Sequence, residues 1–175
     1  MRLSHLSVMT IPALGLLAWT ATAQPPTPPD VPVALRPPAG QTLYLEARGT
    51  GVQIYECSRK ADSTYEWAFK GPEATLTDVS GQPLGKHYAG PTWESTDGST
   101  VVGEVKAKDP GPRPSAVPWL LLSAKANTGS GIFSGARSIQ RVATTGGVAP
   151  AEACTGANLK QVARVPYTAT YYFYR

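Results

Sequence analysis

The residues best suited to chemistry gather around one bend of the chain, Gly90-Pro91. His87, Tyr88, Trp93 and Glu94 flank this dipeptide within a few positions. Because proline cannot continue a ladder of strand hydrogen bonds, the chain is expected to turn here and bring the four side chains together. An imidazole beside a carboxylate suits general acid–base catalysis. Aromatic and polar side chains side by side suit the binding of sugars or small organic molecules.

A binding or interaction module is the first functional hypothesis. The predicted ligand-binding residues combine stacking surfaces with directed hydrogen bonds: His87, Tyr88, Trp93, Glu94, Trp119 and Arg141. The partner would be a small molecule or a component of the cell envelope. The competing interpretation is that Trp93 and Trp119 belong to the core, because tryptophan is heavily buried on average.

An extracytoplasmic enzyme is the second hypothesis. His87 is its best candidate catalytic residue, acting as general acid or base, with Glu94 or Asp97 orienting the ring. The competing interpretation is that His87 caps a strand or forms a hydrogen bond with a backbone carbonyl. No serine lies in a G-x-S-x-G turn, and no cofactor is implied. His87 is the only histidine after residue 23, so no transition-metal site is predicted.

A structural envelope protein is the third hypothesis. Tyr167, Tyr171, Tyr172 and Tyr174 would then lie on a free strand edge that pairs with a partner. Alternating aromatic residues are equally typical of an inner strand, so a core role competes with this hypothesis.

Residues 1–23 read as a secretory signal peptide. Arg2 and His5 precede a mostly apolar stretch at 6–19, and Ala21-Thr22-Ala23 fits the small-x-small cleavage pattern. The alternative is a membrane anchor, but the stretch is shorter than the roughly 20 residues that a bilayer requires. The protein is therefore expected to be secreted or periplasmic, with no membrane span after cleavage.

The two cysteines, Cys57 and Cys154, both follow the predicted signal peptide. An exported chain folds in an oxidising compartment, which favours one disulfide between them. The alternative is a pair of free buried thiols.

The charge of the chain gives no indication of a nucleic-acid partner. Removal of Arg2 with the signal peptide leaves 15 basic and 12 acidic residues, a net charge of +3. Lys106, Lys108 and Arg113 form the nearest approach to a cluster, whereas nucleic-acid-binding proteins usually carry a basic stripe.

Residues 24–39 form a proline-rich leader, predicted to be an extended spacer. A ligand for a proline-binding domain is the alternative. Residues 40–175 follow as a single β-rich domain. Alternating apolar and polar residues predict strands at 43–47 and 52–57, joined by a turn at 48–51.

Further strands are predicted at 65–70 and 74–77, and a strand, bend and strand at 86–94. Alternation at 101–108 and a short apolar run at 139–143 add two more. A strand is also predicted at 119–127, where helix is the competing assignment. The clearest strand is 164–175, which is rich in aromatic and β-branched residues. The fold class is therefore all-β, an antiparallel β-sandwich or barrel with long loops and one disulfide.

Several stretches of the sequence resemble one protein family. They are PPAGQ at 37–41, GVQIYEC at 51–57, GKHYAGPTWE at 85–94, SIQRV at 138–142 and VPYTATYYF at 165–173. In this order they resemble the family catalogued as domain of unknown function 3455. The resemblance implies exported proteins of bacteria and fungi, and it transfers no catalytic residue. Some fungal relatives are labelled malate dehydrogenase, but this chain has no G-x-G-x-x-G motif to hold a dinucleotide.

Overall fold

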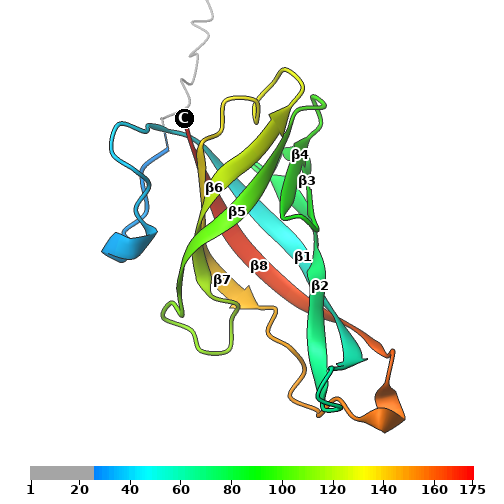
Figure 1. Ribbon diagram of the computed structural model, residues 1–175. Coiled ribbons are helices and arrows are strands. Elements are labelled where there is room, and N and C mark those ends of the chain that lie inside the picture. Colours follow the sequence, from blue (N-terminus) through cyan, green and yellow to red (C-terminus); the bar gives the residue numbers. More distant parts are fainter. Residues whose placement is uncertain (1–25) are drawn as a thin grey trace, which may run out of the picture.

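Eight antiparallel strands close into a barrel in the order of the chain (Figure 1). The structure is a computed structural model that describes residues 26–175. The strands are β1 (Leu43–Arg59), β2 (Tyr65–Thr77), β3 (Pro83–Tyr88), β4 (Thr92–Ser95), β5 (Thr100–Asp109), β6 (Trp119–Thr128), β7 (Ser138–Gly146) and β8 (Val162–Tyr174). Two short 3-10 helices, η1 (Val33–Leu35) and η2 (Gly156–Asn158), complete the described elements. The predicted signal peptide and its cleavage point lie outside the described residues.

The prediction of an all-β antiparallel fold is confirmed, and of the two architectures considered the structure shows the barrel. The strand, bend and strand around Gly90-Pro91 are confirmed as β3 and β4. The strand predicted at 119–127 is confirmed as β6, and the competing helix assignment is wrong. The two strands predicted at 65–70 and 74–77 are one continuous strand, β2.

The predicted turn at 48–51 is wrong, because β1 runs through it without a break. Its glycines allow close packing between strands. A Cβ atom at Gly51 would collide with the carbonyl oxygen of Glu73 on β2, and one at Gly49 would lie 2.7 Å from the ring of Tyr171. Glycine inside a strand often marks such an approach.

The last strand, β8, alternates between the two faces of the barrel wall as predicted. Tyr167, Ala169, Tyr171 and Phe173 are buried in the main core. β8 pairs with β1 along one edge and with β7 along the other. From Tyr167 to Tyr174, the part that carries the four tyrosines, it therefore has no free edge for a partner strand.

The proline-rich segment differs from a plain spacer. Leu35 in η1 is fully buried, and with Val31 it packs on Leu121 of β6 and Val142 of β7, outside the barrel. The side-chain amide of Gln140 donates a hydrogen bond of 2.6 Å to the Leu35 carbonyl oxygen. The segment is held because its two apolar side chains cover an apolar patch on the barrel wall.

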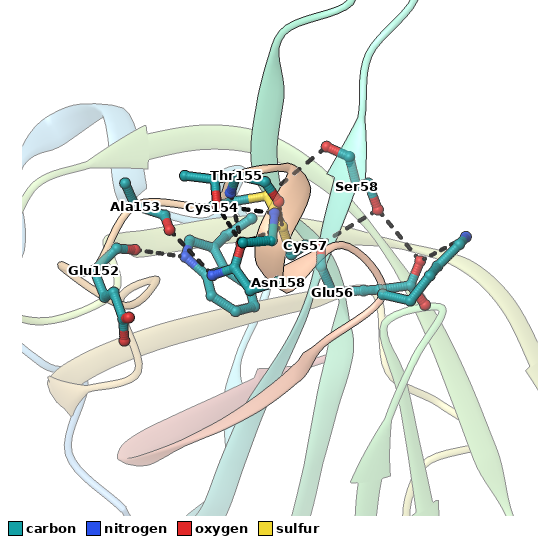
Figure 2. The surroundings of a disulfide bond; sticks show 11 residues. Glu56, Cys57, Ser58, Glu152, Ala153, Cys154, Thr155 and Asn158 are labelled. Carbon is teal, nitrogen blue, oxygen red and sulfur yellow. Dashed lines mark hydrogen bonds and ion pairs between the residues drawn. A yellow bond between two sulfur atoms is a disulfide. The ribbon is translucent and has the colours of Figure 1, made fainter.

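The predicted disulfide between Cys57 and Cys154 is confirmed (Figure 2). It joins β1 to the long connection between β7 and β8. Two further contacts hold the same connection: the Trp67 indole donates to the Glu152 carbonyl oxygen at 2.8 Å, and the Cys57 amide donates to the Gln161 carbonyl oxygen at 2.9 Å. The connection is thus fixed to the lower ends of β1 and β2.

The barrel wall is incomplete on one side because β3 and β4 are short. β3 pairs with β2 only from Glu73 onward, and β4 pairs with β5 only as far as Val102. Beyond these points, residues 65–70 of β2 pair only with β1, and residues 104–109 of β5 pair only with β6. Figure 1 shows β2 and β5 diverging below β3 and β4. A lateral opening results between these two strands.

The glycine at position 51 provides a test of this packing. Gly51→Ala should lower the free energy of unfolding by about 1–3 kcal/mol, because the new methyl group meets backbone that cannot move aside easily. Gly135→Ala is the matched control, since its Cβ would meet no atom within 4 Å. Urea unfolding of both variants measures the difference. Equal stability of the two variants would contradict the packing described for β1 and β2.

The disulfide should contribute substantially to stability because it closes a loop of 97 positions. Replacing both cysteines with serine should lower the free energy of unfolding by about 2–5 kcal/mol. Urea unfolding of the oxidised protein and of the double variant measures this, and reduction of the wild type should reproduce the variant. An unchanged midpoint in both comparisons would contradict the expectation.

Candidate functional site

The residues around the Gly90-Pro91 bend divide between the two faces of the barrel wall. His87 and Trp93 are opposite each other on β3 and β4 and point into the core. Their rings stack with centroids 4.4 Å apart, and their exposed fractions are only 2% and 1%. Tyr88 and Glu94, the next residues along each strand, point outward. Successive strand residues face opposite sides, so the bend does not form one joint site.

His87 has the environment of a structural histidine. Its Nδ1 atom lies 2.8 Å from the carbonyl oxygen of Thr92, which can only accept, so Nδ1 carries the proton. Burial disfavours the charged imidazolium and lowers the pKa of His87 to about 3. The ring is thus neutral at pH 7. It lacks the solvent access and the carboxylate neighbour that general acid–base catalysis requires.

The outward-facing pair of the bend forms a self-contained surface cluster. The Tyr88 hydroxyl donates to Glu94 at 2.8 Å, and the Lys86 ammonium lies 3.1 Å from the other carboxylate oxygen. The hydrogen bond from Tyr88, followed by that from Lys86, lowers the pKa of Glu94. The Glu94 carboxylate on β4 therefore already has a hydrogen-bond donor and a cation from the neighbouring strand β3.

Asp97, the other carboxylate considered for His87, holds two loops together. It accepts hydrogen bonds from the hydroxyl of Ser99 at 2.6 Å and from the backbone amide of Ile132 at 2.8 Å. These bonds, with that from the Ser99 amide, lower the pKa of Asp97 to about 2. Its role is to join the turn after β4 to the loop after β6.

Trp119 lies apart from the bend. It begins β6 and is half-buried on the outer wall, where it packs against the cluster formed by Val31, Leu35, Leu121 and Val142. Of the six residues predicted to bind ligand, the structure therefore brings His87 and Trp93 together inside and Tyr88 and Glu94 together outside. Trp119 lies on the outer wall, and Arg141 lies elsewhere.

Arg141 reaches into the lower part of the barrel from β7. Its Nε and Nη2 atoms donate to the Pro118 carbonyl oxygen at 3.2 and 2.7 Å. Burial lowers the pKa of Arg141. The neighbouring tyrosines, chiefly Tyr171, would raise that pKa only when their phenols are ionised. Within residues 26–175 the guanidinium forms no ion pair with a carboxylate. It is a half-buried cation without an ion-pair partner among the described residues.

A cavity of about 320 Å³ opens beside Arg141 at the lateral opening of the barrel. Its lining residues come from five strands and the segment before β6: Gln53, Tyr55, Phe69, Val105, Lys108, Val117, Pro118, Leu120 and Arg141. Apolar atoms form most of its walls. No aspartate or glutamate is among these residues, so its charge is entirely positive.

Gln53 lies behind the wall of this cavity with its side-chain amide buried. Its side chain is 1% exposed, and it lies beside the Tyr167 hydroxyl, close enough to lower the pKa of that phenol. Its Nε2 nonetheless makes no hydrogen bond of acceptable geometry with any described residue. Buried polar groups are normally paired, so an acceptor is expected at this position.

The cavity residues apart from Arg141 were not predicted from the sequence. Period-two alternation at 51–57 places Gln53 on the same face as Tyr55 and Cys57, and a glutamine on an inward face was the one available signal. Phe69, Val105 and Lys108 come from strands that meet at the cavity only because β3 and β4 are short. No local sequence pattern indicates that β2 and β5 border the same cavity.

No helix in residues 26–175 has both the length and the apolar character needed to cross a membrane. Nor do these residues contain three or more His, Cys, Asp or Glu side chains grouped so that they could hold a metal ion.

The fold and the site together define the class of protein: a closed eight-stranded antiparallel barrel whose lateral cavity is lined by Arg141 and Lys108. Within that class, the chain belongs to the family described as protein of unknown function (DUF3455), which matches residues 38–175. The match spans all eight strands and agrees with the resemblance seen in the sequence. No curated protein and no solved structure matches the chain.

The burial of His87 predicts a pH-dependent stability. Its pKa is near 6.5 in the unfolded chain and about 3 in the folded one, so the unfolded state binds the extra proton between these values. Stability should therefore fall as the pH drops from 6.5 toward 3, approaching about 1.4 kcal/mol for each pH unit.

His87→Phe keeps an aromatic ring on Trp93 and removes the titration. Urea unfolding between pH 7 and pH 4 should show a shallower decline for this variant than for the wild type. Parallel pH profiles would show that His87 titrates normally and is not buried as described.

Proposed function

We propose that this protein is an exported binding module that holds a carboxylate-bearing organic ligand in the lateral cavity beside Arg141. The observation that carries the proposal is a half-buried guanidinium with no carboxylate neighbour among the described residues. Withdrawing a cation from water without giving it a partner is unfavourable. A ligand carboxylate would remove this penalty and accept a second pair of guanidinium hydrogen bonds.

The polar groups of the cavity favour an anion over a neutral sugar. Arg141 and Lys108 are cationic donors, and no carboxylate is among the lining residues. The Tyr55 hydroxyl has given its proton to the Gly147 carbonyl oxygen at 2.7 Å, so it adds only an acceptor. A carboxylate requires donors only.

The walls of the cavity indicate the rest of the ligand. The rings of Tyr55 and Phe69 lie 5.5 Å apart at one side, and Val105 and Leu120 extend the apolar surface. Such walls suit an aromatic or branched aliphatic group. A volume of about 320 Å³ is at the small end for ligand sites, so one such group fills it.

Two features support action outside the cytoplasm. The first 23 residues have the pattern of a secretory signal peptide, and the Cys57–Cys154 disulfide is typical of an oxidising compartment. Both features fit the periplasm and the extracellular medium.

Arg141→Gln tests the proposal directly. Thermal stabilisation by phenylacetate, benzoate and isovalerate is measured beside that of the corresponding neutral amides. The wild type should be stabilised by at least one acid and by none of the amides, because a bound ligand raises the midpoint by mass action. Arg141→Gln should weaken binding of that acid about tenfold or more, while Lys125→Gln, distant from the cavity, should bind as the wild type does.

The unliganded midpoint of the same variant is a second readout. Glutamine retains a donor for the Pro118 carbonyl oxygen but removes the unpaired charge, so Arg141→Gln should be as stable as the wild type or more stable. An Arg141→Gln protein that is stable and still binds the acid would overturn the proposal. Equal stabilisation by acids and amides would overturn it as well.

A further inference from the structure

We infer that the ligand is the C-terminal end of an extended peptide, which adds as a strand in the opening between β2 and β5 and places its terminal carboxylate at Arg141. This inference rests on the proposed function and names the class of ligand. It joins two features of the same place, the unpaired strand edges and the cationic cavity.

Two strand edges border the opening. Residues 65–70 of β2 and 104–109 of β5 carry backbone hydrogen-bonding groups with no strand partner on the side of the opening. A closed barrel normally removes every edge, and proteins usually block those that remain. An extended peptide is the ligand that satisfies such a row of groups, by adding a strand to the sheet.

The side chains on the two edges support the same ligand. Phe69 on β2 is 55% exposed and Val105 on β5 is 39% exposed, and both line the cavity. Large apolar side chains exposed together mark contact surfaces more often than free ones. In strand addition the backbone contributes affinity, and such pockets select alternate side chains of the peptide.

The positive charge of Arg141 favours the C-terminus of a peptide over an internal segment. An internal peptide segment carries no charge in its backbone and would leave Arg141 unpaired. A terminal carboxylate brings one negative charge with two acceptor oxygens, which matches the Arg141 fork. Lys108 at the exposed rim adds attraction along the approach.

A small free acid satisfies only part of this arrangement. It would pair with Arg141 but leave the backbone groups of the strand edge unpaired and Phe69 largely exposed. The peptide terminus is therefore the more complete match.

The test is affinity selection from a hexapeptide mixture, randomised at every position and N-acetylated. The mixture is presented to the full mature chain either with free C-terminal carboxylates or as C-terminal amides, and bound peptides are identified by mass spectrometry. We expect enrichment of apolar or aromatic final residues from the free acids and none from the amides. The best peptide, made singly, should lose about tenfold or more in affinity as its amide and on Arg141→Gln.

Backbone methylation of that peptide tests strand addition separately. N-methyl groups are placed at each peptide bond in turn, and each derivative is titrated against the wild type. The opening lies below two strands, β3 and β4, so a single peptide pairs with one of its edges and not with both. Affinity should therefore fall at alternate positions, because only every second amide of an added strand faces that edge. This readout changes the ligand only, so protein folding cannot confound it.

Three outcomes separate this inference from the proposed function. Binding of small acids through Arg141 without any enriched peptide would overturn the peptide inference and leave the proposed function standing. Equal enrichment of acids and amides would overturn the terminal carboxylate. Failure of small acids and peptides alike would overturn both.

Discussion

The pairing of β1 with β8 is the interaction on which the rest of the structure depends. It joins the first strand of the domain to the last along thirteen residue pairs, and it brings the rings of β8 into the interior. The close approach at Gly49 and Gly51 allows β8 and β2 to lie against β1 without collision. A pairing between chain ends is slow to form and costly in loop entropy, so the disulfide that shortens the unfolded chain supports it.

The site follows from a mismatch in strand length. β1, β2 and β8 have 17, 13 and 13 residues, whereas β3 and β4 have 6 and 4. The short pair closes only the upper part of the wall (Figure 1). Below it, the interior that would otherwise be filled by packed side chains remains open, and Arg141 can remain charged there beside a lined cavity.

Local patterns predicted the strands well but not the places where strands meet. Alternation identified β8 and the inward face of Tyr167 to Phe173, and the position of the cysteines predicted their bond. The glycines at 49 and 51 read as a turn because a turn and a close strand contact require the same missing side chain. For the site, proximity in sequence around His87 was misleading, since neighbouring strand residues face opposite ways. Arg141 was identified by type, whereas its neighbours depend on tertiary pairing across the sequence.

The docked proline-rich segment moves the physical start of the domain upstream of the family match. That match begins at residue 38, but Val31 and Leu35 already cover Leu121 and Val142 on the barrel wall. A chain trimmed to the matched region would present this apolar patch to water. The smallest unit that keeps this patch covered thus begins before Val31. Only residues 24–30 then separate the docked segment from the predicted cleavage point.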